Sequence, residues 1–310
     1  MENEHRTGGR KISVSFGEDN FKGNLMKKIM FAFCISIASA FFICAAKEKE
    51  EKLDLKRVKK SMAKVMDNVY ACKYEATNLE YRIFLNELKA NYKNDDYKIA
   101  EVDTAGWKRR FKYAYMDPLT TMYSWHPAYD NYPVVNVSFE GAALFCNWLT
   151  EKYNSWNGRA FKKVKFRLPS HEEWELAARG GKKGLDYPTG NQLIGDNGRY
   201  RCNYQPLGDE RIKCINDTNK FEIIKDTSVH RFQFSADGAT YTVSVNAYLP
   251  NGFGLYNASG NAAEMVLEKG IARGGSWWDT GYNVRIDSRR KYENTSPMVG
   301  FRYFMEVIEK

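Results

Sequence analysis

The sequence has few of the residues that bind transition metals. Its 310 residues include six cysteines and four histidines, and no cysteine follows Cys214. His126, His171 and His230 lie far apart, without the short spacing that places two imidazoles on one metal ion. The part of the chain after Cys214 therefore offers no thiolate, which is the ligand that soft metals require.

Motifs for other kinds of catalysis are also missing. The chain has no glycine-rich phosphate loop and no Gly-x-Ser-x-Gly nucleophile elbow. Ser276 and Asp279 have no histidine near them in sequence. These absences exclude a catalytic set that is local in sequence, whereas residues from distant segments can still meet in a folded chain.

An excess of positive charge is spread along the whole chain. The sequence has 47 lysines and arginines against 38 aspartates and glutamates, which gives a formal net charge of +9. The basic residues are interspersed with acidic ones and form no run interleaved with aromatics, so no nucleic-acid partner is expected. A solvated basic surface is the favoured interpretation.

Residues 26–46 have the order of a secretory signal peptide, because two lysines after Met26 precede an apolar run that small residues close. We expect translation to start at Met26, which leaves residues 1–25 as a non-native or disordered extension. A transmembrane anchor and a lipid anchor on Cys44 are the alternatives. Each option places residues 47–310 outside the cytoplasm, with membrane contact only through this N-terminal segment.

Four cysteines remain in that exported part, namely Cys72, Cys146, Cys202 and Cys214. Four thiols allow three disulfide pairings, and the sequence does not choose among them. Cys202 and Cys214 lie in one loop-like segment and are the favoured pair. Cys146 lies in a helical pattern and is predicted to be a buried thiol.

Local patterns predict one loop-rich α+β domain over residues 65–310, after a charged tether over residues 47–64. Helix starts are marked by two capping boxes and a serine cap, which are Thr77 with Glu80, Ser170 with Glu173, and Ser138. Gly180-Gly181 ends the last of these helices. Strands are predicted over residues 69–74 and 133–137, an aromatic-rich ordered loop over residues 91–132, and only short strands and turns after residue 181.

Four segments in order resemble the formylglycine-generating-enzyme (sulfatase-modifying-factor) family. They are Tyr74–Tyr81, Pro133–Leu149, Phe166–Gly181, and the motifs from Pro250 to Arg302 that include Gly274-Gly275-Ser276-Trp277. The resemblance implies a variant of the C-type lectin fold, α+β, loop-rich and formed by a single domain. A narrower stretch, Asp103–Pro133, resembles gliding-motility and type IX secretion lipoproteins. It implies a structural part of the periplasm or outer-membrane-associated cell envelope, with envelope proteins or glycans as partners.

The same resemblance implies that the family's chemistry is missing. The family's oxidase converts a sulfatase cysteine to formylglycine with oxygen, and it holds Cu(I) between two thiolates. Those cysteine positions fall on Asp279 and Val284, and neither side chain can become a thiolate. Copper is therefore not expected, and a non-catalytic envelope protein is favoured. The alternative is an enzyme of the family, an oxidoreductase or another activity, with altered active-site chemistry.

The family also binds structural calcium, and the resemblance implies two Ca²⁺ sites. One would use Asn257, Gly260, Ala262 and Glu264, and the other Asn203, Tyr204, Asp237 and Ala239. Side-chain and backbone oxygens of this kind are the ligands that calcium takes.

A binding groove is a further prediction. Its candidate residues are Trp277, Trp278, Tyr282 and Arg302, although core packing is favoured for the tryptophans. Arg273, Arg289 and Arg302 are also candidates for pairs with nearby carboxylates.

Overall fold

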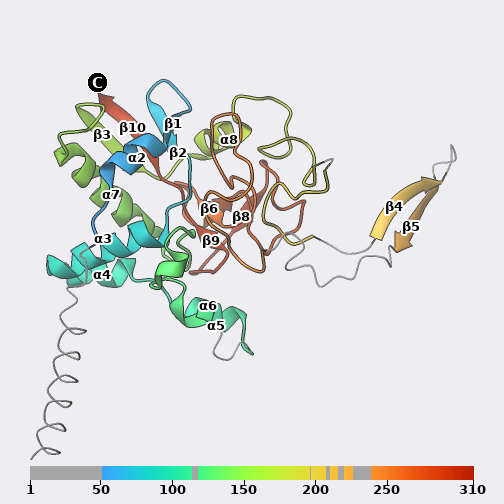
Figure 1. The fold of residues 1–310 in the computed structure, drawn as a ribbon, viewed down its shortest axis with the longest axis horizontal. Coiled ribbons are helices and arrows are strands. Elements are labelled where there is room, and N and C mark those ends of the chain that lie inside the picture. Colours follow the sequence, from blue (N-terminus) through green and yellow to red (C-terminus); the bar gives the residue numbers. More distant parts are fainter. Residues whose placement is uncertain (1–50, 114–117, 196, 207–209, 216–219, 226–238) are drawn as a thin grey trace, which may run out of the picture. The chain divides into compact units, whose positions relative to one another are not determined.

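The computed structural model describes residues 51–113, 118–195, 197–206, 210–215, 220–225 and 239–310 (Figure 1). The described residues from Lys52 onward belong to one unit of an α+β fold, as predicted. The predicted signal peptide, residues 26–46, lies outside the described residues. Within the described part of the chain, no helix has both the length and the apolar character needed to span a membrane.

A four-stranded antiparallel sheet joins the beginning of the domain to its end. Its order is β1-β2-β10-β3, formed by Met62–Lys64, Val69–Cys72, Phe304–Glu309 and Lys163–Arg167. The C-terminal strand β10 pairs with β2 through Phe304 and Ala71, and with β3 through Phe304 and Arg167. Figure 1 shows this red strand beside the blue N-terminal strands.

Three predicted helices are confirmed, and each starts at its predicted cap. These are α3 (Asn78–Ala90), α7 (Phe139–Ser155) and α8 (His171–Arg179). Thr77 and Ser170 each complete a capping box, and the Ser138 hydroxyl accepts from the N–H group of Gly141. Gly180 ends α8 in the left-handed conformation.

Helix α7 brings the largest rings of the main core onto the first sheet. Phe145 packs against Phe84 of α3 and against Phe301 and Tyr303 beside β10, all fully buried. The prediction that Cys146 is a buried thiol is confirmed in this core. The side chain of Cys214 lies outside the described side chains, so the Cys202–Cys214 pairing stays a prediction.

A second four-stranded sheet carries the C-terminal motifs. Its order is β8-β7-β6-β9, formed by Arg289–Lys291, Ile271–Arg273, Ala263–Met265 and Val299–Gly300, with β6 and β9 parallel. A separate hairpin pairs β4 (Glu210–Ile215) with β5 (Lys220–Lys225). The prediction of short strands in this half is confirmed, except that β4, β5 and β10 each have six residues.

The prediction of a charged tether is wrong for residues 55–64, which form α2 (Leu55–Ser61) and β1. Asp54 caps α2 by accepting from the N–H group of Lys56 at 3.0 Å, and Val58 is buried in the main core. The lysines and arginine of α2 lie on its exposed face, and their number hid the few buried positions.

The aromatic segment 91–132 also contains more regular structure than predicted. Its described residues, which leave out 114–117, form three short α-helices and a 3₁₀ turn, namely α4 (Asn94–Ala100), α5 (Ala105–Arg110), α6 (Pro118–Met122) and η1 (Pro127–Tyr129). Helices of five to seven residues are too short to show a periodicity in sequence.

The strand predicted over residues 133–137 is absent from this described segment. Pro133 makes a single bridge to Thr77, and Asn136 adopts a left-handed conformation with φ of 59°. The segment is instead buried without pairing as a strand, and its N–H groups at Val134 and Asn136 donate to Ala76 and Ser296.

Candidate functional site

The positions that the family resemblance assigns to cysteines lie after a tight turn at Gly274-Gly275-Ser276. Both glycines have positive φ, 82° and 65°. A Cβ atom on Gly275 would lie 2.8 Å from Cγ1 of Val284, so the turn and the Val284 side chain are in direct contact. Both Asp279 and Val284 therefore lie beside this turn, because Asp279 also bonds to Ser276.

Asp279 is held by three donors. Its Oδ2 accepts from the N–H group of Ser276 at 2.9 Å and from the Ser276 hydroxyl at 2.6 Å. The same oxygen forms an ion pair with Arg290 of β8. The carboxylate is thus oriented by Ser276 and its charge is matched by a guanidinium.

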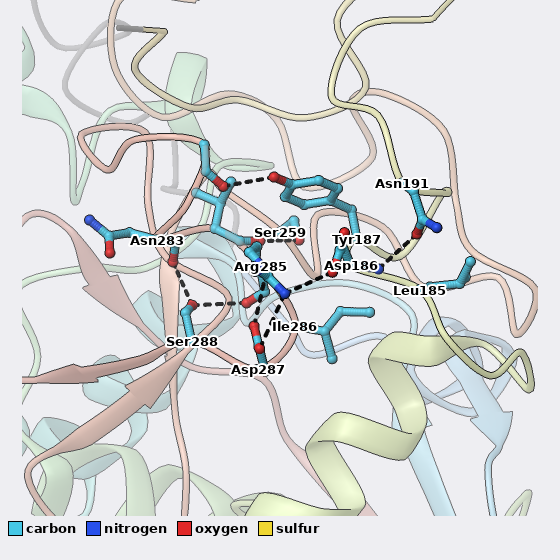
Figure 2. A network of polar contacts seen from close by, with 12 residues as sticks. Leu185, Asp186, Tyr187, Asn191, Ser259, Asn283, Arg285, Ile286, Asp287 and Ser288 are labelled. Carbon is cyan, nitrogen blue, oxygen red and sulfur yellow. Dashed lines mark hydrogen bonds and ion pairs between the residues drawn. The ribbon is translucent and has the colours of Figure 1, made fainter. Parts of the chain in front are cut away.

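Val284 presents only methyl groups, and its side chain is 0% exposed. The loop that carries it is fixed from several sides (Figure 2). The Ser259 hydroxyl donates to the Val284 carbonyl at 2.6 Å, and the Tyr187 hydroxyl donates to the Gly281 carbonyl at 3.0 Å. Arg285 pairs with Asp186 at 2.8 Å. The loop therefore has little freedom to bring other ligands to these two positions.

The described thiols are poor substitutes for the two missing ones. Cys72 and Cys146 are buried in the main core, and burial raises the pKa of both thiols. Cys202 lines a small cavity with Tyr187 and Ser259, which makes it a single thiol near the loop. In the described part of the chain, no group of three or more Cys, His, Asp or Glu side chains is arranged to hold a metal ion. These residues do not fit a Cu(I) centre of the two-thiolate kind.

A buried charge cluster is formed by Glu264, Arg302 and Glu75. Glu264 of β6 and Arg302 are each 1% exposed, and Arg302 donates to the two Glu264 oxygens through Nε and Nη2 at 2.6–3.1 Å. The indole N–H of Trp174 donates to Glu264 at 2.7 Å. The expected pairing of Arg302 with a carboxylate is confirmed, as is that of Arg273, which pairs with Glu175 at 3.2 Å.

Glu75 is the second carboxylate of this cluster. It is buried, and it accepts from the amides of Asn257 and Asn261 and from the N–H group of Ala262. Burial and the nearby charge of Glu264 raise the pKa of Glu75 to about 8. The raised pKa favours the protonated form of Glu75 near neutral pH, beside the ion pair of Glu264 and Arg302.

Sequence reasoning missed Glu75 and Arg290. A signal existed for Glu75, since it is an acidic residue directly after a strand pattern and inside a family motif. No such signal marked Arg290, because its partner Asp279 lies in the loop between β7 and β8, and only the fold brings the two side chains together.

The predicted ligands of the first calcium site differ in whether their oxygens are already hydrogen-bonded. Asn257 has a buried Oδ1 that no described atom hydrogen-bonds, which is an atom that a cation can use. Both oxygens of Glu264 already accept from Arg302 or Trp174, so a calcium ion would have to compete with a guanidinium for this carboxylate. Calcium at this turn stays a prediction.

The second predicted calcium site is only partly described. Asp237 lies outside the described residues. Asn203 is buried, and its amide donates to the Tyr241 carbonyl at 2.6 Å, while Ala239 is also buried. This site and the role of Tyr204 in it stay predictions as well.

The four groove candidates do not lie on one surface. Trp277 is buried in an aromatic cluster with Trp107 and Tyr241, which confirms the favoured interpretation of core packing for this residue, and Arg302 is buried with Glu264. Trp278 is half-buried under the Arg110 guanidinium, which lies 3.8 Å from the ring centre, and Tyr282 is 74% exposed.

The two described histidines make their contacts outside this loop. His126 caps η1, and His230 lies outside the described residues. The side chain of His171 is 14% exposed, and it contacts Glu268 at 2.6 Å and Arg273 at 3.3 Å.

The fold and the site together define a class of protein. It is a loop-rich α+β domain in which a fixed loop follows a Gly-Gly-Ser-Trp turn. The chain belongs to the family described as sulfatase-modifying factor enzyme 1-like domain, whose family model matches residues 35–307. This result confirms the family resemblance, whereas the likeness to gliding-motility lipoproteins stays a prediction.

Curated relatives agree with this assignment. The chain is 32% identical over 170 residues to the formylglycine-generating enzyme of Thermomonospora curvata, which covers 55% of this chain and 42% of that protein. It is 30% identical over 186 residues to the inactive C-alpha-formylglycine-generating enzyme 2 of Mus musculus, covering 55% and 48%. The match thus spans less than half the length of these relatives.

Among solved structures, the crystal structure of CarF is similar with a TM-score of 0.43 and 20% identity, covering 77% of this chain and 86% of that one.

Proposed function

We propose that this chain is a non-catalytic member of its family that binds an envelope protein or glycan outside the bacterial cytoplasm. One observation carries the proposal. The two family cysteine positions hold Asp279, which Ser276 and Arg290 engage, and the fully buried Val284. Neither position carries a thiol, so thiol chemistry is not possible there.

The comparisons support a role without catalysis. Relatives include a protein named as an inactive formylglycine-generating enzyme, at an identity similar to that of the active enzymes. The fold of such a domain can therefore be retained when the reaction is not.

The surface next to Asp279 supports partner binding. The Arg110 guanidinium stacks on Trp278 at 3.8 Å, and Arg285 lies 5.5 Å from the ring centre of the exposed Tyr282. Aromatic rings and arginines are the residues that dominate binding energy at protein interfaces. We assign this face to the partner.

Copper binding and peptide oxidation test the lack of catalysis. The unmodified protein is expected to lose Cu(I) to a competing chelator and to leave a cysteine-containing sulfatase peptide unoxidised. The double variant Asp279→Cys/Val284→Cys places two thiols beside the Gly275-Ser276 turn and is expected to retain one Cu(I) per chain. Spectrophotometric chelator competition and peptide mass measure both effects.

A matched control variant introduces two cysteines at positions other than 279 and 284. Val243→Cys/Ser288→Cys adds two thiols in different loops, because Val243 bonds to Asn261 and Ser288 bonds to Asn283, and the variant should retain no more copper than the parent. Oxidation of the peptide by the unmodified protein would disprove the proposal and favour the enzyme alternative. Failure of the double variant to gain copper would show that Asp279 and Val284 are not the paired positions.

Export is a separate part of the proposal, and cell fractionation with mass determination tests it. We expect the chain in the envelope fraction, either cleaved after residue 46 or lipidated on Cys44. Recovery from the cytoplasm with residues 26–46 intact would contradict export and leave the copper result unaffected.

A further inference from the structure

A groove of about 720 Å³ is lined by residues between Thr189 and Arg201 and by Tyr248 and Leu249. Its described lining residues do not include those of the face assigned to the partner. The volume lies within the roughly 300–1,000 Å³ that is usual for small-molecule sites. We call it the Arg199–Tyr248 groove.

Two arginines of this groove project from one short segment. Residues 193–195 pair antiparallel with residues 199–201. The N–H group of Arg201 donates to the Leu193 carbonyl at 2.9 Å, which fixes the register of the two segments. In extended chains that pair in this way, side chains two residues apart point to the same side. Arg199 and Arg201 therefore face the same way, and both line the groove.

The guanidinium of Arg201 is held in a fixed place. Its Nη1 donates to the Thr189 carbonyl at 3.0 Å. A Cβ atom on Gly190 would lie 2.8 Å from Nη1, and one on Gly195 would lie 3.5 Å from Nε, so two glycines make room for this planar group. The Nε and Nη2 groups of Arg201 donate to no described atom. The donors that remain for a ligand are thus preorganised.

The positive charge of the groove is not compensated within the described part of the chain. Neither Arg199 nor Arg201 forms an ion pair there, and no described acidic residue lines the groove. Arg285 differs, since it pairs with two aspartates. Asp196 lies outside the described residues. Two guanidiniums on one side of a groove favour an oxyanion, to which an arginine can offer two parallel N–H groups.

The second segment that lines the groove is apolar and aromatic. Leu249 is 66% exposed, and it follows Tyr248 directly. Tyr248 has φ of 62°, a left-handed conformation that is uncommon for a residue other than glycine. Such strained residues cluster at binding sites. An apolar body placed on these two side chains removes their surface from water, which is favourable.

The two segments together select one class of ligand. A cation is repelled by the arginines, and a neutral apolar molecule leaves both guanidiniums without a partner. A bare inorganic oxyanion pairs with the arginines and leaves Tyr248 and Leu249 uncovered. A molecule that carries both an oxyanion group and an apolar body uses the whole lining.

We propose that the Arg199–Tyr248 groove binds a small organic anion. Its carboxylate or phosphate group accepts from the guanidiniums of Arg199 and Arg201, and its apolar body lies on Tyr248 and Leu249. This inference goes beyond the proposed function and does not rest on it, since neither Trp278 nor the Asp279 position lines the groove.

Isothermal titration calorimetry of the unmodified full chain tests the proposal. The probes are phenyl phosphate and benzoate as organic anions, inorganic phosphate as a bare oxyanion, and benzyl alcohol as a neutral ring. At least one organic anion is expected to bind saturably with a Kd of roughly 1 mM or below. It should bind about fivefold or more tightly than inorganic phosphate and benzyl alcohol, because each of these lacks half of the contacts. Tighter binding of phenyl phosphate assigns the groove to phosphate esters, and tighter binding of benzoate assigns it to carboxylates.

Two variants locate the binding. Arg199→Gln removes an exposed guanidinium that no described side chain pairs with, so the variant should fold, and it should raise the Kd of the organic anion about tenfold. Arg289→Gln is the matched control, because it removes an exposed arginine of β8 that does not line the groove, and it should leave the Kd unchanged.

Three results would overturn the proposal. They are the absence of saturable binding of either organic anion, equal affinity for inorganic phosphate and the organic anion, and equal affinity of Arg199→Gln and Arg289→Gln. Because the copper test uses other residues, either proposal can fail without the other.

Discussion

Replacing Arg302 with leucine is expected to lower the free energy of unfolding by about 3–5 kcal/mol. The change leaves Glu264 as a charge in a site that is 1% exposed, with only Trp174 still donating to it. It also leaves two carbonyls, of Cys72 and Tyr256, without the guanidinium donors that now lie 2.9 and 2.7 Å away. Chemical denaturation followed by tryptophan fluorescence measures the loss.

Two further variants make this prediction specific. Arg109→Leu breaks an ion pair with Asp103 whose arginine is 55% exposed, and it should cost no more than about 1 kcal/mol. Adding Glu264→Gln to Arg302→Leu removes the unpaired charge and should recover part of the loss. Equal losses for Arg302→Leu and Arg109→Leu would show that the buried pair is not what stabilises this region.

The loss should also grow with pH. Burial raises the pKa of Glu75 to about 8, and the Arg302 charge works against that rise. A raised carboxyl pKa favours the protonated folded form, so stability falls as pH increases from the ordinary value of 4.5 through the folded value. Without Arg302 the ionised Glu75 is disfavoured further. Denaturation at about pH 6 and about pH 9 is therefore expected to give the larger loss at the higher pH.

Helices were predictable where a capping motif of neighbouring residues marks the first turn. Thr77 with Glu80 and Ser170 with Glu173 are capping boxes three residues apart, and each one begins a helix. The sheets were not predictable in the same way. Strand β10 is paired to β2 across more than 200 residues, and no local pattern records such a partner. The segment 133–137 shows the converse, since its valines are buried while Asn136 breaks the extended backbone.

The site was predictable only as far as residue types decide chemistry. Asp279 and Val284 exclude thiolates from the sequence alone. The environment of Asp279 depends on Arg290 and the Ser276 turn, which only the fold brings together. Unpaired buried atoms such as Oδ1 of Asn78 have no sequence signature at all, because pairing is a property of the packed interior.

The turn that carries the predicted calcium ligands is expected to tolerate no side chain at Gly260. Its φ is 73°, and a Cβ atom there would lie 2.0 Å from the backbone oxygen of Asn203. That oxygen also accepts from the N–H group of Asn261 at 2.8 Å, so it cannot move without breaking the turn. Gly260→Ala should lower the free energy of unfolding by about 3–5 kcal/mol, from left-handed strain and overpacking together.

Gly198 separates these two contributions, because it has the same φ of 73° and a Cβ atom there would meet nothing within 4 Å. Gly198→Ala therefore carries only the backbone strain and should cost about 1–2 kcal/mol. Thermal and chemical denaturation of both variants under identical conditions give the difference, which is the cost of the contact with Asn203. If Gly260→Ala is no less stable than Gly198→Ala, the two loops do not touch as closely as their backbones indicate. A larger loss at Gly260 means that this turn is fixed by steric contact between its own backbone and that of Asn203, so that its geometry persists whether or not a cation binds.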